Sequence, residues 1–282
     1  MNIKRLSKRY FFDFGNFKIV DLADKRPNLF ILGSQKCGTT SLHNYLNEHP
    51  SIFMSSPLKE SGYFIYEQWM KPYWKSKKLK VKNKTDLLLK YMLKGYNGEF
   101  YFGDSSTYYT IDQREKDFDI PRLIKDEVNE PMFLYLIRNP FERIISLYHH
   151  LVKYEGYNNT LSNVVKSSKS ALNTSLYFTR LSHFLNFFPK DSFHIIQFEN
   201  LILNPQNEVS KIYNFLDIDD FKHKSFGQFN KTTPSEVKKF SQEDYNYLII
   251  HFEKEKKMLE EFFKINLSWD FTDKSWVNNS ID

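Results

Sequence analysis

Residues 28–46 read NLFILGSQKCGTTSLHNYL. The apolar run at 28–32 is typical of a buried strand, and the apolar spacing that follows Gly38 is typical of an amphipathic helix. A short loop that carries Lys36 lies between them. Backbone N–H groups converge at such a corner, and the dipole of the helix favours an anion there. The stretch therefore predicts a phosphate-binding loop between a strand and a helix.

The lysine of this loop is not where a nucleoside triphosphatase has it. The Walker A loop reads G-x-x-x-x-G-K-[ST], and Gly33 and Gly38 have the separation of its two glycines. Thr39 then stands where the lysine should be, and the lysine lies earlier, at Lys36. This arrangement favours another phosphorylated donor, and a helix simply capped by Thr39 or Thr40 is the alternative. The predicted anion-binding residues are Lys36, Cys37, Gly38, Thr39, Thr40 and Ser41.

A second strand-to-helix corner lies near the middle of the chain, where residues 131–151 read PMFLYLIRNPFERIISLYHHL. Arg138 ends the apolar run, and Ser146 follows two helical turns later. An arginine fork donates two parallel hydrogen bonds to a phosphate. Arg138 and Ser146 therefore predict a second phosphate site, distinct from the first. The alternative is an arginine paired with Glu142 and a serine packed on its helix.

The two motifs together resemble those of the sulfotransferase family. The first is similar to the family's 5′-phosphosulfate loop, and the second is similar to its 3′-phosphate site. The resemblance implies the donor 3′-phosphoadenosine 5′-phosphosulfate (PAPS), whose sulfuryl group moves in line to a hydroxyl or amine of an acceptor. It implies no metal, and the sequence has no His, Cys and Asp cluster with metal-ligand spacing.

Four further segments are closest to the carbohydrate (heparan-sulfate-type) and bacterial branches of the family. Residues 57–64, PLKESGYF, resemble the Lys-Glu-x-His-Phe-Phe segment of heparan-type enzymes, with Gly62 in place of the histidine. Residues 103–109, GDSSTYY, resemble Gly-Glu-x-Ser-Pro-x-Tyr. Residues 177–189 and 198–205 are similar to a later helix and to a later Glu-x-Leu…Asp-Pro segment. The resemblance implies a carbohydrate or glycoconjugate acceptor.

The resemblance also implies roles for single residues. Lys36 would neutralise charge on the leaving phosphate, and Glu60 aligns with the glutamate that serves as base. Asp104 is the second candidate for the base, with a helix N-cap as its alternative role. Asn230 and Lys231 lie in a late loop with a weak resemblance to a segment that reaches the 3′-phosphate or the adenine.

Alternating apolar and amphipathic runs predict the fold. Buried strands are expected at 28–32, 99–102, 132–137 and 193–198. Helices are expected at 39–47, 141–152, 204–215 and 241–264. This order predicts the α/β class, with a single three-layer domain, a central parallel sheet flanked by helices and a P-loop-like nucleotide-binding topology. We expect an N-terminal extension at 1–27 and the sulfotransferase domain at 28–282.

The net charge and composition of the chain exclude few kinds of binding partner. The 282 residues carry a net charge of +6, which fits an anionic substrate, a nucleic acid or a membrane surface equally well. Residues 71–84 hold seven lysines, which form either a patch for an anionic glycan or a solvated surface. We expect no nucleic-acid partner, and the oligomeric state is open. An aromatic content of 17% predicts an aromatic-rich core.

The lone cysteine, Cys37, rules out an intrachain disulfide. The helix dipole and the neighbouring Lys36 predict a lowered pKa for its thiol. No apolar run is long enough to span a bilayer, so we expect a cytoplasmic enzyme without a transmembrane segment. A lumenal domain separated from its anchor is the alternative.

Two other functions stay open at this point. A P-loop kinase or nucleotide hydrolase should have lysine at position 39, where this chain has threonine. A non-catalytic nucleotide-binding relative is the other alternative. It is kept open by Gly62, and by Ser105 where the heparan-type enzymes have a lysine.

Overall fold

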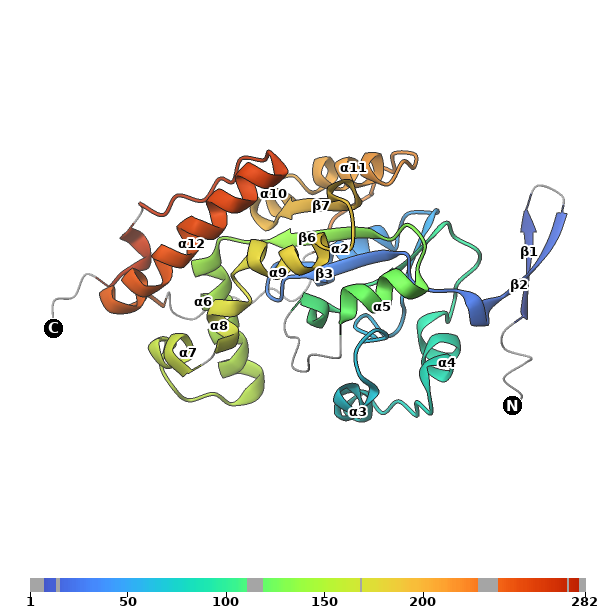
Figure 1. Ribbon diagram of the computed structural model, residues 1–282, viewed down its shortest axis with the longest axis horizontal. Coiled ribbons are helices and arrows are strands. Elements are labelled where there is room, and N and C mark those ends of the chain that lie inside the picture. The colour runs from blue at the N-terminus through green and yellow to red at the C-terminus, as the bar shows by residue number, and fades with distance from the viewer. Residues whose placement is uncertain are drawn as a thin grey trace.

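The computed structural model describes residues 8–13, 16–110, 119–167, 169–227, 238–272 and 274–278 (Figure 1). Its strands are β1 (Lys8–Asp13), β2 (Asn16–Asp21), β3 (Leu29–Gly33), β4 (Ile52–Met54), β5 (Tyr101–Asp104), β6 (Met132–Ile137) and β7 (Phe193–Gln197). Its α-helices are α2 (Thr39–Leu46), α3 (Glu67–Ser76), α4 (Lys84–Leu87), α5 (Ile120–Glu127), α6 (Pro140–Glu155), α7 (Leu161–Ser167), α8 (Lys169–Asn173), α9 (Tyr177–Leu185), α10 (Phe198–Leu203), α11 (Pro205–Phe215) and α12 (Gln242–Phe263).

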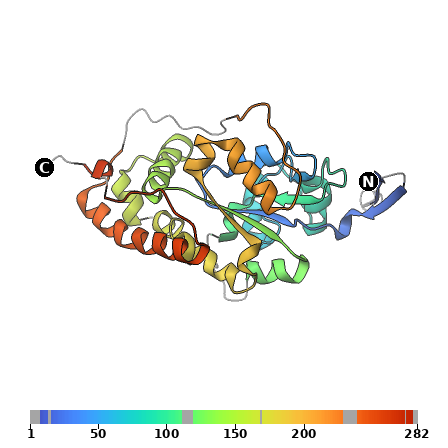
Figure 2. The ribbon, with the colours of Figure 1, turned by 90° about the horizontal axis from the view of Figure 1, so that it is seen from above.

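Five strands form one parallel sheet in the order β4-β5-β3-β6-β7. Helices α2 and α11 cover one face of this sheet, and α5 and α9 cover the other (Figures 1 and 2). Every residue of β3, β4 and β5 is buried, as expected of strands that are covered on both faces. The predicted three-layer α/β fold is therefore confirmed.

Aromatic side chains fill much of the core between the layers. The ring of Phe133, on the central part of the sheet, lies 5.5 Å from that of Phe30 and 4.8 Å from those of Phe188 and Phe193, centroid to centroid. Each such ring removes a large apolar area from water, and close ring pairs add a further favourable contact. The expected aromatic-rich core is present.

The strand order brings three chain segments to one edge of the sheet. β3 lies between β5 and β6, and all three strands run in the same direction. The loops that follow them therefore leave the sheet side by side, at the carboxyl end, where ligands bind in open α/β sheets. The loop at 34–38, Asp104 and Arg138 are gathered there by topology alone.

One strand begins later than the sequence predicts. The apolar run at 99–102 was expected to form it, but β5 spans Tyr101–Asp104. The side chain of Phe100 is 71% exposed and takes no part in the core. Gly103 is included because its backbone pairs with Leu29 of β3, which a hydropathy pattern does not reveal.

A hairpin in the expected N-terminal extension has no counterpart in the sequence prediction. β1 and β2 pair antiparallel and form a separate two-stranded sheet. The hairpin lies at the N-terminal side of the domain (Figure 1).

A buried glutamate joins two helices on one side of the sheet. Glu255 of α12 accepts hydrogen bonds from the backbone N–H groups of Phe178 (2.6 Å) and Thr179 (3.0 Å), and from the Thr179 hydroxyl. These groups belong to the first turn of α9, whose N-cap position holds Leu176 and lacks a side-chain cap of its own. The carboxylate thus supplies the acceptor that a helix N-terminus requires.

Replacing Glu255 by glutamine should lower the free energy of unfolding by about 1–3 kcal/mol, because a buried donor then loses its acceptor. Urea unfolding followed by circular dichroism measures the change. Glu253→Gln, at an exposed position of the same helix, is the matched control. Equal midpoints for the two variants would contradict the role given to Glu255.

Candidate active site

The loop between β3 and α2 ends at a helix N-terminus whose N-cap residue is a glycine. This residue, Gly38, has no side chain with which to cap the helix. The alternative role of Thr39 or Thr40 as the cap is therefore not observed. An uncapped first turn directs its backbone N–H groups at an incoming anion, with the helix dipole in support. The local structure fits the predicted phosphate cradle.

Glycine is required at position 38 by a neighbouring ring. The backbone of Gly38 has φ 85°, and a Cβ placed there would lie 2.7 Å from two carbons of the Phe198 ring. Phe198 begins α10, directly after β7. The guanidinium of Arg138 also lies over this ring, 4.6 Å from its centroid. Phe198 thus packs against both predicted phosphate-binding corners.

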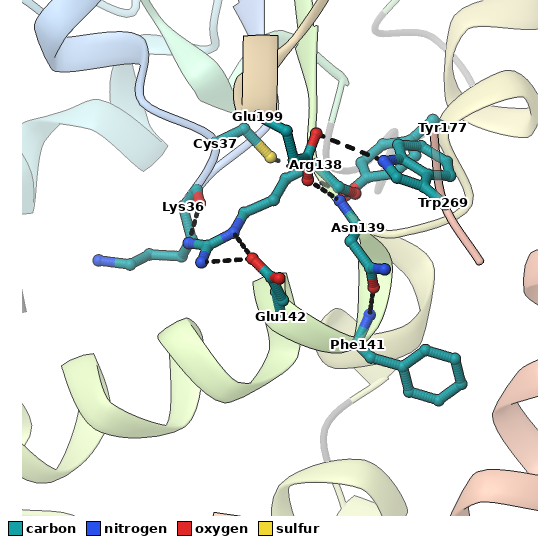
Figure 3. Close-up of polar contacts among 9 residues, drawn as sticks. All are labelled: Lys36, Cys37, Arg138, Asn139, Phe141, Glu142, Tyr177, Glu199 and Trp269. Carbon is teal, nitrogen blue, oxygen red and sulfur yellow. Dashed lines mark hydrogen bonds and ion pairs between the residues drawn. The ribbon is translucent and has the colours of Figure 1, made fainter. Parts of the chain in front are cut away.

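Arg138 contacts both the loop and its own helix. Its Nη1 donates to the backbone oxygen of Lys36 (3.4 Å), while Nε and Nη2 donate to Glu142 at 3.2 and 2.9 Å (Figure 3). The alternative pairing of Arg138 with Glu142 is therefore present. It does not exclude an anion, because the guanidinium also faces the loop. A phosphate would share or displace the contact with Glu142.

Positive charge accumulates around Lys36. Burial lowers the pKa of Lys36, and the nearby charges of Arg138 and Arg143 lower it further. Arg143 is fully buried and donates to the Ser175 hydroxyl (2.6 Å). Each of these cations makes the charged form of Lys36 less favourable, so an anion beside the lysine would be stabilised.

Ser146 lies on the face of α6 that is turned to this charge. Glu142, Ser146 and His150 are spaced four residues apart and share one helix face. Glu142 bonds Arg138 at one end of this face. At the other end, burial and then the charge of Lys36 lower the pKa of His150. Ser146, between them, is directed toward the predicted phosphate-binding region.

The thiol of Cys37 differs from the expectation. Cys37 is fully buried, and its Sγ lies 3.9 Å from the Tyr177 hydroxyl. Burial raises the pKa of the thiol to about 11, although the charges of Arg143 and Arg138 oppose this. The prediction of a lowered pKa was wrong because desolvation of the thiolate outweighs the nearby cations. Cys37 is a packed loop residue whose thiol is held in the protonated form by its burial.

Glu60 is joined to the phosphate loop through the neighbouring lysine. Lys59 Nζ donates to the Thr39 hydroxyl (3.2 Å) and to Glu60 Oε1 (3.1 Å). The Thr107 hydroxyl donates to Glu60 Oε2 (3.3 Å). The side chain of Glu60 is 23% exposed. The candidate base is therefore partly open to solvent and is two hydrogen bonds from the first residue of α2.

Asp104 lies nearby but is fully enclosed. Its carboxylate accepts hydrogen bonds from the hydroxyls of Ser61, Ser106 and Tyr109, and its exposure is 0%. Burial raises the pKa of this carboxyl group, although the three hydroxyls oppose the change. An acceptor cannot touch a carboxylate without exposed surface. The geometry therefore favours Glu60 over Asp104 as the candidate base.

Packing explains two departures from the heparan-type pattern. Gly62 has φ 63°, and a Cβ there would lie 2.4 Å from the end of the Met70 side chain, so a larger residue would require Met70 to move. Ser105 is buried and shares a 2.8 Å hydrogen bond with His43 Nδ1. Burial, followed by the charge of Lys59, lowers the pKa of His43 to about 3. His43 is consequently neutral at physiological pH.

Two predicted site residues have no described position, and the lysine run lies on the surface. Asn230 and Lys231 lie outside the described residues. In the lysine run, Lys84 is half-buried and the other six lysines are exposed. Among the residues that the structure describes, no cluster of three or more His, Cys, Asp and Glu side chains is arranged to hold a metal ion.

Sequence reasoning assigned no site role to Phe198, and it did not predict the contact between Lys59 and Thr39. The strand predicted at 193–198 included Phe198 as its last residue, whereas β7 ends at Gln197 and Phe198 begins α10. The contact of Lys59 with Thr39 joins residues 20 positions apart, and no local pattern encodes it.

Comparison with known proteins points to one family. A family model described as "Sulfotransferase domain" matches residues 26–261. The chain is 23% identical to the "Membrane-associated sulfotransferase kil1" of Dictyostelium discoideum, over 86% of this chain and 66% of that protein. It is 26% identical to the "Heparan sulfate glucosamine 3-O-sulfotransferase 5" of Mus musculus, over 70% of this chain and 55% of that protein. The chain thus spans about two thirds and about half of these relatives.

A solved structure supports the fold. The sulfotransferase from Alicyclobacillus acidocaldarius superposes with a TM-score of 0.67, covering 86% of this chain and 98% of that one at 23% identity. At this identity the likeness concerns the fold alone. None of the helices in the described part of the chain has the length and apolar character needed to cross a membrane.

Proposed function

This chain belongs to the sulfotransferase domain family, and on that premise we propose that it transfers the sulfuryl group of PAPS to a hydroxyl of a carbohydrate acceptor. The observation that carries the proposal is the hydrogen-bonded sequence from Thr39 through Lys59 to Glu60. It places a partly exposed carboxylate next to an uncapped helix N-terminus. A base and an anion cradle then share one site.

The donor fits the charge and geometry of the two corners. The open first turn of α2 and the side chain of Lys36 suit the 5′-phosphosulfate, because both favour negative charge. Arg138 and Ser146 suit the 3′-phosphate on the neighbouring strand-to-helix corner. Two anion sites on adjacent strands match a nucleotide with phosphate on both sides of its ribose.

The residues divide the chemistry between them. Glu60 accepts the proton of the acceptor hydroxyl while the oxygen of that hydroxyl forms a bond to sulfur. Lys36 stabilises the charge that collects on the phosphate oxygen as the old sulfur–oxygen bond breaks. Lys59, bonded to Glu60, is placed to stabilise the sulfuryl oxygens. The products are a sulfate ester, the protonated Glu60 and 3′-phosphoadenosine 5′-phosphate (PAP).

The side chains on and around helix α3 favour an acceptor that carries negative charge. Burial, and then the negative charge of Glu60, raises the pKa of Tyr73 to about 12, and the same two causes raise the pKa of Tyr108. Both tyrosines therefore lie near the proposed base. The ammonium of Lys77 lies 5.6 Å from the centroid of the Tyr73 ring. The exposed lysine run thus begins beside Glu60, where it would attract a glycan that carries negative charge.

Calorimetric titration of PAP and of ATP, both without magnesium, tests the donor assignment. We expect tight binding of PAP, weak binding of ATP, and at least about tenfold weaker binding of PAP to Arg138→Ala, because a charge-assisted bond to the phosphate is lost. Arg122→Ala removes an exposed arginine from α5 and should leave the affinity unchanged. Preference for ATP, or equal affinity in Arg138→Ala, would contradict the proposal.

An acceptor screen follows with the same protein. Sulfuryl transfer from PAPS should be faster to anionic than to neutral glycans at equal concentration. Tight binding of PAP without turnover on any acceptor would instead support a non-catalytic nucleotide-binding protein.

A further inference from the structure

The peptide bond between Arg138 and Asn139 is held at both of its polar ends. The Tyr177 hydroxyl donates to the carbonyl oxygen of Arg138 (2.8 Å). On the other side of the same peptide, the Asn139 N–H donates to Glu199 Oε1 (2.6 Å) (Figure 3). Rotation of this peptide would break both bonds, so its plane is fixed.

A tryptophan from the segment after α12 completes the arrangement. Trp269 Nε1 donates to Glu199 Oε2 (3.4 Å), and its ring lies 5.8 Å from that of Tyr177, centroid to centroid. Trp269 is itself anchored, because Lys256 Nζ donates to its backbone oxygen (2.6 Å). Tyr177 and Trp269 are both buried. Side chains from α9, α10 and the C-terminal segment thus converge on one peptide.

The backbone at this position matters because it sets the point from which the arginine side chain reaches its contacts with Glu142, the Lys36 carbonyl and the Phe198 ring. The guanidinium bonds Glu142, which is 35% exposed, and makes a long contact to the Lys36 carbonyl. The direction in which the side chain leaves the strand is set by the peptide that follows it. The same peptide leads into α6 through Asn139, whose Oδ1 accepts from the N–H of Phe141 (3.1 Å). Ser146 is therefore positioned by it as well.

We propose that Tyr177, Glu199 and Trp269 are positioning residues that set the affinity for the donor's 3′-phosphate by fixing the Arg138–Asn139 peptide. The inference rests on the proposed function, since it assigns the phosphate contact to Arg138. Tyr177 and Glu199 bond the peptide, and Trp269 bonds Glu199, so the three residues hold the backbone rather than the guanidinium. Their contribution reaches the donor only through Arg138 and α6.

A double-mutant cycle tests the proposal. Glu199→Gln retains one carbonyl oxygen for two donors, and Trp269→Phe removes the indole N–H while keeping a ring. Each is expected to weaken PAP binding about 3- to 10-fold and to raise the KM for PAPS by a similar factor, with kcat unchanged. In the Arg138→Ala background each substitution should weaken PAP binding much less than in wild type, because the main group that they position is absent and only the contribution through Ser146 remains.

Adenosine 5′-phosphate, which lacks the 3′-phosphate, gives a second readout. Its affinity should be the same in wild type, Glu199→Gln and Trp269→Phe. Glu208→Gln, at another buried glutamate that pairs with Lys211 on α11, controls for a general loss of stability. Thermal unfolding confirms that each variant is folded before titration.

The outcomes separate this inference from the proposed function. If wild type fails to bind PAP, or if Arg138→Ala binds it normally, the proposed function itself is wrong. If Arg138→Ala loses affinity but Glu199→Gln and Trp269→Phe do not, the positioning role is wrong. Full additivity of Glu199→Gln with Arg138→Ala, or equal weakening of adenosine 5′-phosphate, would also overturn it.

Discussion

Replacing Lys36 by alanine is expected to lower the rate of sulfuryl transfer by about 100- to 1,000-fold while the protein stays folded. The ammonium group is half-buried beside Arg138, where it stabilises developing negative charge more strongly than it would in water. The Lys36 carbonyl, which accepts from Arg138, is retained in the variant. Steady-state transfer from PAPS and thermal unfolding measure the two parts of this prediction. Unchanged turnover would remove Lys36 from the mechanism.

The pH profile should identify Lys36 as the group concerned. Burial lowers its pKa, so the ammonium loses its proton at a lower pH than an ordinary lysine does. The charged form is the active one, so kcat/KM for PAPS, which reports the free enzyme, should fall as the pH rises through this lowered pKa. Lys36→Arg keeps a charge that does not titrate in this range and should lose the alkaline fall. If the rate of Lys36→Arg falls at alkaline pH as the wild-type rate does, the fall belongs to another group.

Glu60→Gln is expected to lower the rate by about 100- to 10,000-fold and to leave PAP affinity nearly unchanged. The amide cannot accept the proton of the acceptor, and its one oxygen retains the bond from Lys59 or the bond from Thr107. Rapid-mix measurement of a single turnover separates this loss from slow product release.

Asp104→Asn serves as the comparison for the base. Its main effect should be on stability, because three hydroxyls lose a charged acceptor inside the protein. Two results together would transfer the role of base to Asp104. The Asp104→Asn protein would be folded and show the rate loss predicted for Glu60→Gln, and the Glu60→Gln protein would remain active.

The fold was predictable because its strands are short, apolar and separated by clear helical periodicity. The strand at 132–137 was predicted to the residue, since a proline precedes it and Arg138 follows it. The start of β5 was misplaced because an exposed phenylalanine and a buried one look alike in sequence. The hairpin of β1 and β2 depends on pairing within a segment that resembles no part of the family.

Local sequence patterns mark the residues of the candidate site, but they do not reveal how those residues are connected. The phosphate loop and Arg138 are marked by local patterns, and the strand order brings them together. The bond from Asn139 to Glu199 joins residues 60 positions apart, so only the folded chain reveals it. The pKa of Cys37 was wrong for a related reason. The sequence displays the neighbouring lysine and the helix, but it does not display the burial that decides the balance.

The uncapped end of α2 affects the release of product between turnovers. Under the proposed function, this helix end and Arg138 hold phosphate groups, and the reaction leaves both phosphates on the spent nucleotide. PAP therefore keeps the anchors that PAPS had, and it competes with the next donor molecule for the same place. Departure of the nucleotide is then a step that every turnover must include. PAP that accumulates should therefore lower the rate of sulfation.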